Sequence, residues 1–138
     1  MTRKEQREAV FGLLFEREFR LEERAEDIFA LSTENRDIDP IKESYIKNVF
    51  FGVVEHQEEI DNLITDASNG WKVSRLSNAV RSAMRLCVYE MKYCSDIPST
   101  VSINEALELV KKFDDPKSRA FTNGVLNNIK NTLESKNE

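Results

Sequence analysis

The sequence predicts an all-α protein, a compact single-domain bundle of about seven helices that takes in residues 1–138. Three observations lead to this prediction. Apolar residues recur at a spacing of three to four along most of the chain, which is the period of an amphipathic helix. The chain has only four Gly and three Pro, the residues that most often interrupt helices. Its length of 138 residues is ordinary for one domain with its own core.

The first expected helix begins after Thr2, which stands three residues before Glu5 in the spacing of a capping box. Its apolar stripe consists of Ala9, Val10, Leu13 and Leu14. Phe11, Phe15 and Phe19 form a second stripe at intervals of four, so this helix is expected to be contacted on more than one side. Two interpretations of Phe15 and Phe19 stay open: packing in the core, which is the commoner use, or contact with a partner.

A shorter helix is expected over residues 22–31, followed by a polar loop over residues 32–39. Asp39 precedes Pro40, an arrangement that is typical of an N-cap and a first helical position. A third helix is therefore expected to start there. Its apolar positions are Ile41, Tyr45, Val49 and Val53.

The fourth expected helix carries Ile60, Leu63 and Ile64 and ends at Asn69 and Gly70, two residues suited to a positive φ. Ser77 is the expected N-cap of a fifth helix, which stops before Pro98. This is the most apolar helix and the expected centre of the bundle. Its apolar face consists of Val80, Met84, Cys87, Val88 and Met91.

Ser102 and Glu105 have the spacing of a second capping box, which predicts a sixth helix that runs to Phe113. Asp115, followed by proline, predicts the start of a seventh helix that ends at about Leu133. The polar end of the chain, ESKNE, is expected to fray.

Charge is unevenly distributed along a chain whose formal net charge is −5. Residues 16–66 hold fifteen Asp or Glu and six Lys or Arg, whereas residues 71–92 hold five Lys or Arg and one Glu. Because salt confines electrostatic potential to about 8–10 Å, the overall negative charge does not exclude a nucleic-acid site. No apolar run approaches the roughly 20 residues of a membrane span, and no apolar signal segment follows the charged N-terminus, so a cytoplasmic protein is expected.

Motifs of the common enzyme classes are absent from the sequence, which has no C-x-x-C, no phosphate-binding G-x-x-x-x-G-K and a single histidine, His56. His56 lies among carboxylates, where a solvated helix end is commoner than a weak metal site. Cys87 and Cys94 are about two helical turns apart, too far for a disulfide, so both are expected to be reduced. We therefore expect no enzymatic activity and no cofactor; the function should lie in binding.

Single-stranded RNA is the ligand that best suits the polar residues of the expected helix ends. Basic side chains beside a helix start favour phosphate, Phe121 offers a stacking platform, and Asn123 offers a base-edge contact. A core interpretation also stays open, because Phe121 is four residues from Val125 and Gly124 would allow close helix contact; a protein interface is a third. The candidate RNA-binding residues are Arg3, Lys4, Arg7, Arg81, Lys117, Ser118, Arg119, Phe121 and Asn123.

The stretch AMRLCVYEM, followed by DIPSTVSINEALELVKKF and SRAFTNGVLNNI, closely resembles the NusB family of transcription antitermination factors. The R-K-x-x-R-E start at residues 3–8 and Trp71 fit the same pattern, so the resemblance spans essentially the whole chain. It implies a monomeric or dimeric helical bundle without catalytic activity. Such proteins bind the boxA RNA of ribosomal operons together with the small-subunit ribosomal protein NusE, help RNA polymerase pass terminators, and aid rRNA maturation.

The resemblance also implies roles for particular positions. The basic cluster at residues 3–7 corresponds to the family's arginine-rich RNA-binding segment, Phe121 to the aromatic of its last motif, and residues 115–119 to its RNA surface. Phe15 lies where an aromatic side chain can face NusE. Phe15 and Phe19 together are the expected partner-binding residues. Two departures are present: Glu5 and Gln6 interrupt the basic cluster, and Thr122 replaces the usual Val. Because each lost phosphate contact lowers the affinity, RNA binding by the protein alone is expected to be weaker.

Two other functions are compatible with the residues. A protein adaptor or homodimer would bind a basic partner through the acidic residues 16–66, without direct RNA binding. The second alternative is a module similar to the NusB-like domain of certain rRNA cytosine methyltransferases. The chain offers no room for a methyl-donor domain after Glu138, which argues against this alternative.

Overall fold

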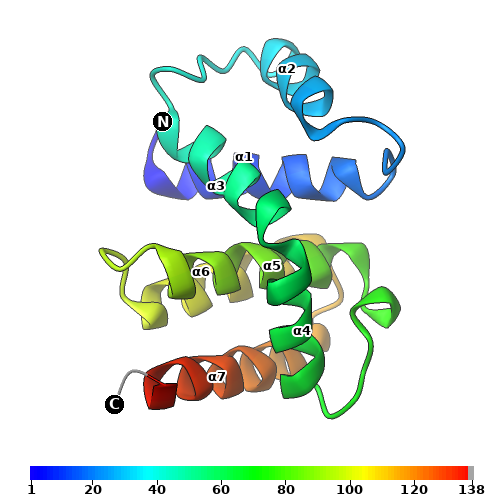
Figure 1. Cartoon of the computed structure of the whole chain (residues 1–138), viewed down its shortest axis with the longest axis vertical. Helices are drawn as coiled ribbons and strands as arrows, with labels where there is room; N and C mark the ends of the chain where they lie inside the picture. The colour runs from blue at the N-terminus through cyan, green and yellow to red at the C-terminus, as the bar shows by residue number, and fades with distance from the viewer. Residues whose placement is uncertain (137–138) are drawn as a thin grey trace. The chain divides into compact units, whose positions relative to one another are not determined.

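In the computed structural model, which describes residues 1–136, the chain is helical and divides into two units: an N-terminal unit, Met1–Glu55, and a C-terminal unit, His56–Glu138. The described residues form seven α-helices and one 3-10 helix, with no β-strand among them (Figure 1). The predicted all-α fold is thereby confirmed. That the chain acts as a single domain stays a prediction. No helix in the described part is long and apolar enough to cross a membrane.

The N-terminal unit consists of three helices, α1 (Arg3–Arg17), α2 (Ala25–Asn35) and α3 (Ser44–Glu55), with α1 in contact with both of the others. Its aromatic core joins α2 to α3. The ring of Phe29 lies 5.8 Å from that of Phe50 and 5.0 Å from that of Phe51. Phe50 is fully buried, so these rings stabilise the pairing of the two helices.

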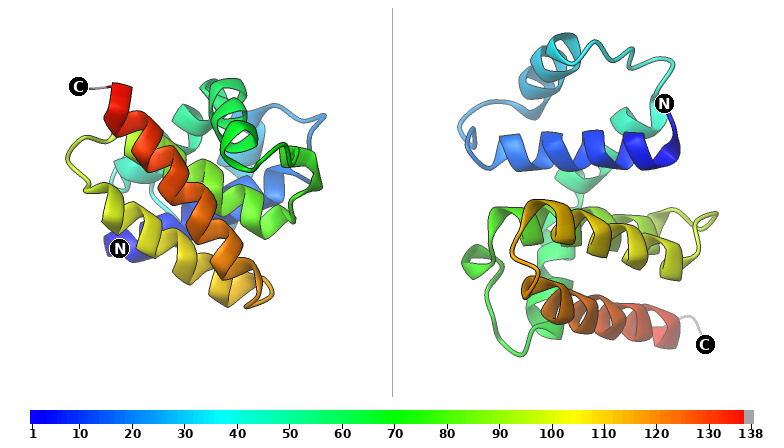
Figure 2. Two further views of the ribbon diagram at one scale, coloured as in Figure 1. Left: turned by 90° about the horizontal axis from the view of Figure 1, so that it is seen from below. Right: turned by 180° about the vertical axis from the view of Figure 1, so that it is seen from behind.

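The C-terminal unit holds α4 (Gln57–Ala67), the 3-10 helix η1 (Val73–Arg75), α5 (Asn78–Tyr93), α6 (Ser99–Phe113) and α7 (Ser118–Lys136). Helix α5 packs against α4, α6 and α7, and α6 and α7 also pack against each other (Figure 2). The prediction that the most apolar helix is central holds within this unit. Met84, Val88 and Leu126 are among its fully buried side chains.

Local capping was predicted correctly at two helix starts and one helix end. Thr2 and Glu5 form the complete capping box of α1. Ser77 accepts the backbone N–H of Val80 at 3.1 Å and caps α5. Asn69 and Gly70 follow α4 with φ values of 53° and 87°, the left-handed conformation that ends a helix.

The predicted bounds of the second helix are wrong: α2 begins at Ala25 and continues through residues 32–35, which were predicted to be loop. Thr33 is buried, and its hydroxyl donates to the carbonyl of Phe29 at 2.7 Å, so a polar side chain is satisfied within the helix itself. Helix α1 ends at Arg17, which leaves Phe19 outside the helix to which it was assigned.

The predicted start of the third helix is also wrong. Asp39 caps a turn, because its carboxylate accepts the N–H of Ile41 at 2.9 Å, but the α-helix begins only at Ser44. Ile41, predicted to lie on the buried stripe, is 88% exposed. The proline therefore marks a turn before the helix rather than its first position.

The last two helices differ from the prediction at their starts and at the end of the chain. Ser102 lies inside α6, where its hydroxyl donates to the fully buried carboxylate of Glu90 at 2.7 Å, so it does not cap the helix. Helix α7 begins at Ser118, because Asp115 caps the preceding turn by accepting the N–H of Lys117 at 2.9 Å. It reaches Lys136, so residues 134–136 are helical where fraying was predicted, and residues 137–138 of that prediction lie outside the described residues.

Candidate nucleic-acid interface

An open pocket of about 370 Å³ lies in the C-terminal unit, between the segment that follows α4 and the start of α7. Three predicted RNA-binding residues contribute to its wall: Lys117, Ser118 and Phe121. Trp71 and Arg75 complete the side that comes from the η1 segment. The pocket therefore combines two aromatic rings with two basic side chains.

The turn after α4 places Trp71 at the pocket. The positive φ of Asn69 and Gly70 reverses the chain, and the N–H of Trp71 donates to the carbonyl of Ser68 at 3.1 Å. Trp71 is 55% exposed and Phe121 is 39% exposed. Large aromatic surfaces in contact with water suit the stacking of a planar ligand such as a nucleic-acid base.

The electrostatic character of the pocket is mixed. Arg75 and Lys117 are exposed cations, but Asp115 also lines the pocket. One carboxylate oxygen of Asp115 accepts the backbone N–H of Lys117. The hydroxyl of Ser118 donates to Asp114 at 2.5 Å. A phosphate would contact the two cations at the edge of the pocket and would be repelled near the two aspartates.

The other predicted RNA-binding residues of this unit lie outside the pocket lining. Arg81 is half-buried, and its guanidinium donates to the carbonyl of Leu76 at 2.8 Å, which holds the pocket wall. Arg119 and Asn123 are exposed on α7, and the Asn123 side chain accepts from the Asn127 amide at 2.9 Å. The structure thus brings together only part of the predicted set.

The burial pattern of α7 argues against the core interpretation of Phe121. Val125 is buried, whereas Phe121 stands at the exposed end of the same stripe. Thr122 is fully buried, and its hydroxyl donates to the Ser118 carbonyl at 2.7 Å. The expectation of close helix contact at Gly124 is wrong, because this residue is exposed and a methyl group there would meet no atom within 4 Å.

Sequence reasoning missed the contribution of Trp71 and Arg75 to this pocket. Trp71 was noted only for its place in the family pattern, and Arg75 only as one of several positive charges. The available signal was a tryptophan directly after a helix-ending Asn-Gly pair, because connecting turns run over the surface of a protein and often carry binding residues.

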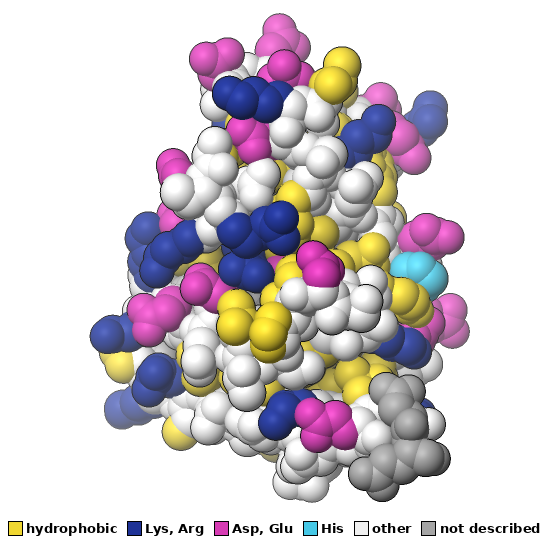
Figure 3. Space-filling model, turned by 90° about the vertical axis from the view of Figure 1, so that its left-hand side faces the viewer, with side chains coloured by type: hydrophobic (Ala, Val, Ile, Leu, Met, Phe, Trp, Pro, Cys, Tyr) yellow, Lys and Arg dark blue, Asp and Glu magenta, His cyan; other side chains and the backbone are white. Residues whose placement is uncertain are grey.

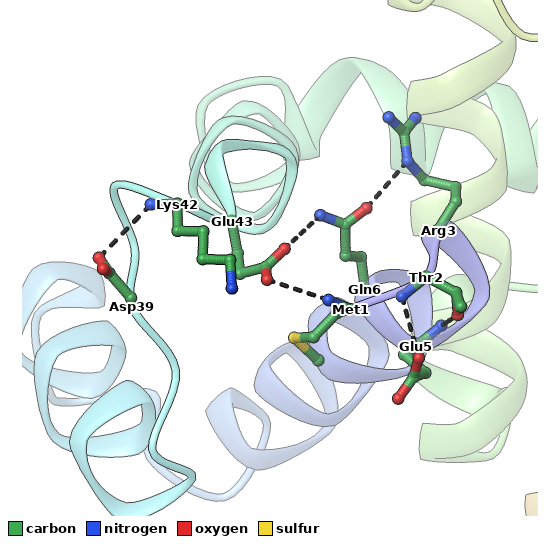
Figure 4. Close-up of polar contacts among 8 residues, drawn as sticks. All are labelled: Met1, Thr2, Arg3, Glu5, Gln6, Asp39, Lys42 and Glu43. Atoms are coloured by element: carbon green, nitrogen blue, oxygen red, sulfur yellow. Dashed lines mark hydrogen bonds and ion pairs between the residues drawn. The ribbon is translucent and has the colours of Figure 1, made fainter.

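The N-terminal basic cluster, residues 3–7, lies in the other unit. Its three basic side chains are not all exposed, as the prediction required. Arg3 and Lys4 are exposed, but Arg7 is only 6% exposed. Arg3 donates from Nε to Oε1 of Gln6 at 3.0 Å, as Figure 4 shows. Hydrogen bonds from the backbone N–H and hydroxyl of Thr2 lower the pKa of Glu5, so a negative charge remains beside the cluster at neutral pH.

Phe11, Phe15 and Phe19 form a ladder of rings with centroid separations of 6.0 Å and 5.5 Å. Phe11 is buried, Phe15 is half-buried and Phe19 is 73% exposed. The core interpretation is therefore wrong for Phe19. The ladder ends as an apolar surface beyond the last turn of α1.

Figure 3 shows one face of the molecule, on which several Lys and Arg side chains gather with Asp, Glu and apolar side chains beside them. A nucleic acid on this face would therefore be positioned by contacts between its phosphates and particular cations.

Comparisons with known proteins agree on one family. The NusB family model matches residues 4–131. A transcription antitermination protein NusB from Agathobacter rectalis is 43% identical, with 91% of this chain and 97% of the relative aligned. One from Geobacillus kaustophilus is 48% identical over 71% of this chain and 72% of the relative.

Solved structures show the same fold. T. maritima NusB superposes with a TM-score of 0.87 at 34% identity and covers 95% of this chain and 92% of its own. A crystal structure of antitermination factors NusB and NusE in complex with dsRNA gives a TM-score of 0.82 at 29% identity, with coverages of 96% and 99%.

Proposed function

Because the chain belongs to the NusB family, we propose that it is a transcription antitermination factor that binds the boxA RNA of ribosomal RNA operons together with NusE. In this role it supports transcription and maturation of rRNA within the antitermination complex of RNA polymerase. It works in the cytoplasm by binding alone, without an enzymatic step or a cofactor.

The observation that carries this proposal is the pocket that joins Trp71 and Phe121 to Arg75 and Lys117. An unpaired base stacks on one or both rings, and the adjoining phosphates lie against the two cations. Stacking on an aromatic side chain contributes about 1–3 kcal/mol per base. Ser118 stands at the same wall, where it offers a hydroxyl to a nearby phosphate or sugar.

The remaining predicted residues take different parts in this proposal. Arg119 and Asn123 extend the contact along the exposed side of α7. Arg81 acts indirectly, by holding the carbonyl of Leu76 in the pocket wall. In the N-terminal unit Arg3 and Lys4 contact phosphates, whereas the burial of Arg7 gives it a supporting role.

NusE binds at the exposed end of the phenylalanine ladder in this proposal. Phe19, with 73% of its surface exposed, is the principal apolar contact, and Phe15 supports its ring from behind at 5.5 Å. Aromatic anchors of this kind carry much of the energy of protein interfaces.

The first test is fluorescence anisotropy with labelled boxA RNA and a scrambled RNA of equal length, with and without NusE, across a salt series. Selective binding that strengthens with NusE is expected. The logarithm of the affinity should fall with log salt by about 0.7 for each phosphate contact. Equal affinity for the two RNAs, with NusE present, would overturn the assignment.

Phe121→Ala tests the pocket itself, and loss of stacking should weaken boxA binding by about five- to 150-fold. Tyr93→Ala is the matched control, since Tyr93 is also 39% exposed but lies about 20 Å along α5 from the pocket residue Val80. Unchanged affinity of a folded Phe121→Ala protein would remove Phe121 from the site.

A protein adaptor without RNA binding is the second candidate, favoured by the exposed Phe19 within the acidic stretch of residues 16–66. It predicts that NusE binds equally well with and without boxA RNA. Phe19→Ala should weaken NusE binding under either function, while Ile41→Ala, which removes an 88% exposed side chain from the same unit, should not. The effect of boxA RNA on NusE affinity therefore discriminates between the two functions.

A further inference from the structure

We propose that Glu43, Gln6 and Tyr45 are positioning residues that hold the guanidinium of Arg3 with its outer edge toward an RNA phosphate. All four residues belong to the N-terminal unit and form one connected set of contacts. Figure 4 shows the hydrogen bonds that link Glu43, Gln6 and Arg3. This inference rests on the proposed RNA-binding function and deepens it, because it explains how an exposed arginine on a mostly acidic unit is prepared for its ligand.

Glu43 determines which way the Gln6 amide points. The carboxylate of Glu43 is buried, and its Oε2 accepts from Nε2 of Gln6 at 2.7 Å, while its Oε1 accepts from the α-amino group of Met1 at 3.2 Å. These two donors lower the pKa of Glu43, with Gln6 the larger influence, so the group is ionised at neutral pH. Because an ionised carboxylate only accepts, the NH₂ end of Gln6 must face Glu43 and its oxygen must face away.

The oxygen of Gln6 in turn fixes one edge of Arg3. Nε of Arg3 donates to Oε1 of Gln6 at 3.0 Å. Arg3 makes no other side-chain hydrogen bond among the described residues, so Nη1 and Nη2 keep their donors available. Figure 4 shows both of these nitrogens directed away from Gln6.

Tyr45 supports one face of the same guanidinium. The Arg3 Cζ lies 4.3 Å from the centre of the Tyr45 ring, and Tyr45 itself is only 9% exposed. A buried ring is a fixed support, and the cation–π contact leaves the charge in place. Arg3 is therefore held at one edge and one face, and the remaining edge has the two-pronged geometry that binds a phosphate in a bidentate manner.

Holding the arginine in advance favours binding because the ordering cost is met before the ligand arrives. An arginine that is free to rotate loses several rotamers on contact with a phosphate. The sequence departs from an arginine-rich start at Gln6, and this substitution supplies the amide that the arrangement needs. Glu5, the other residue that interrupts the basic cluster, accepts the N–H of Thr2 at 2.9 Å and takes no part in holding Arg3.

The test is a double-mutant cycle on the full-length chain, with labelled boxA RNA and NusE present. Gln6→Met keeps the length of the side chain and removes both amide groups, and it should weaken binding about two- to tenfold, the cost of immobilising one arginine side chain. Arg3→Ala should weaken binding and reduce the salt slope by about 0.7 to 1.4, for one or two phosphates. The double variant Arg3→Ala/Gln6→Met should bind as Arg3→Ala does.

Two further variants keep the result interpretable. Glu43→Gln removes the charge that orients Gln6 and should give the same loss, again only while Arg3 is present. Lys47→Ala removes an exposed cation of the same unit that makes no contact with this set among residues 1–136. The RNA affinity of this variant should stay within twofold of that of the unaltered chain. Circular dichroism and thermal unfolding establish that each variant is folded at the assay temperature.

The possible outcomes separate this inference from the function on which it rests. The positioning role is overturned if Gln6→Met and Glu43→Gln bind boxA with the affinity of the unaltered chain. It is also overturned if these substitutions lower the affinity by the same factor in an Arg3→Ala background. Either result leaves the RNA-binding function standing. If Arg3→Ala leaves affinity and salt slope unchanged, Arg3 contacts no phosphate and the inference is also overturned. If the unaltered chain does not prefer boxA to scrambled RNA, the proposed function itself fails.

Discussion

The ion pair between Asp61 of α4 and Arg85 of α5 should be costly to break. Nε of Arg85 donates to Oδ1 of Asp61 at 2.9 Å, and Nη2 donates to Oδ2 at 2.9 Å. The side chains of Arg85 and Asp61 are 9% and 24% exposed. Asp61→Asn keeps the shape of the side chain, removes the negative charge and turns one acceptor into a donor that faces the guanidinium.

The magnitude follows from the burial of the two partners. Removing one member of a buried ion pair costs about 3–5 kcal/mol, because the other charge is left without compensation. Asp61 is about one-quarter exposed, so water can reach the vacated side, and Arg85 keeps further interactions. We therefore expect Asp61→Asn to lower the free energy of unfolding by about 2–3 kcal/mol.

Urea unfolding followed by far-UV circular dichroism measures this change. Glu134→Gln is the control, since Glu134 is 60% exposed and lies 3.8 Å from Lys130 in the same unit. The effect of Glu134→Gln on the free energy of unfolding should stay within about 0.5 kcal/mol. The double variant Asp61→Leu/Arg85→Met should be more stable than Asp61→Asn, because it leaves no buried charge unpaired. A loss below about 0.5 kcal/mol for Asp61→Asn would refute the reasoning, because it would mean that water compensates the guanidinium fully.

Two further predictions concern polar side chains within the units. Thr122→Val should change the free energy of unfolding by less than about 1 kcal/mol and leave RNA affinity unaltered, because the Thr122 hydroxyl donates only to the Ser118 carbonyl within α7. Urea unfolding measures the stability, and fluorescence anisotropy measures the RNA affinity. A larger loss of stability would contradict this account of the hydroxyl. Glu43 has a pKa below its ordinary value of 4.5, so the stability it contributes is complete above pH 4.5 and is lost as pH falls through the lowered value. The thermal midpoint of Glu43→Gln should therefore fall less steeply with acid than that of the unaltered chain, and parallel curves would contradict the assignment.

Helices and their caps could be predicted because the relevant forces act over a few residues. The pairing of Thr2 with Glu5 and the cap at Ser77 depend on hydrogen bonds that span three positions. The periodic apolar stripe likewise identifies a helix from neighbouring residues alone. The fold class followed from such local features repeated along the chain.

Features that depend on distant residues were not predicted from local patterns. Ser102 has the spacing of a helix cap, yet it lies within α6 because its hydroxyl reaches Glu90, twelve residues away on α5. Arg7 belongs by composition to a basic cluster, but its burial separates it from Arg3 and Lys4. A local pattern offers a polar side chain several partners, and the choice among them is made by burial.

The sequence by itself determined that this chain is helical, that it resembles one RNA-binding family, and that Phe121 and Arg3 were candidate contacts. Only the tertiary structure brought Trp71 and Arg75 to the pocket of Phe121, placed Phe19 on the surface, and joined Glu43 to Gln6. The physical reason is that stacking, ion pairing and burial depend on distance in space. The packing of whole helices sets that distance, and a helical period alone contains no information about it.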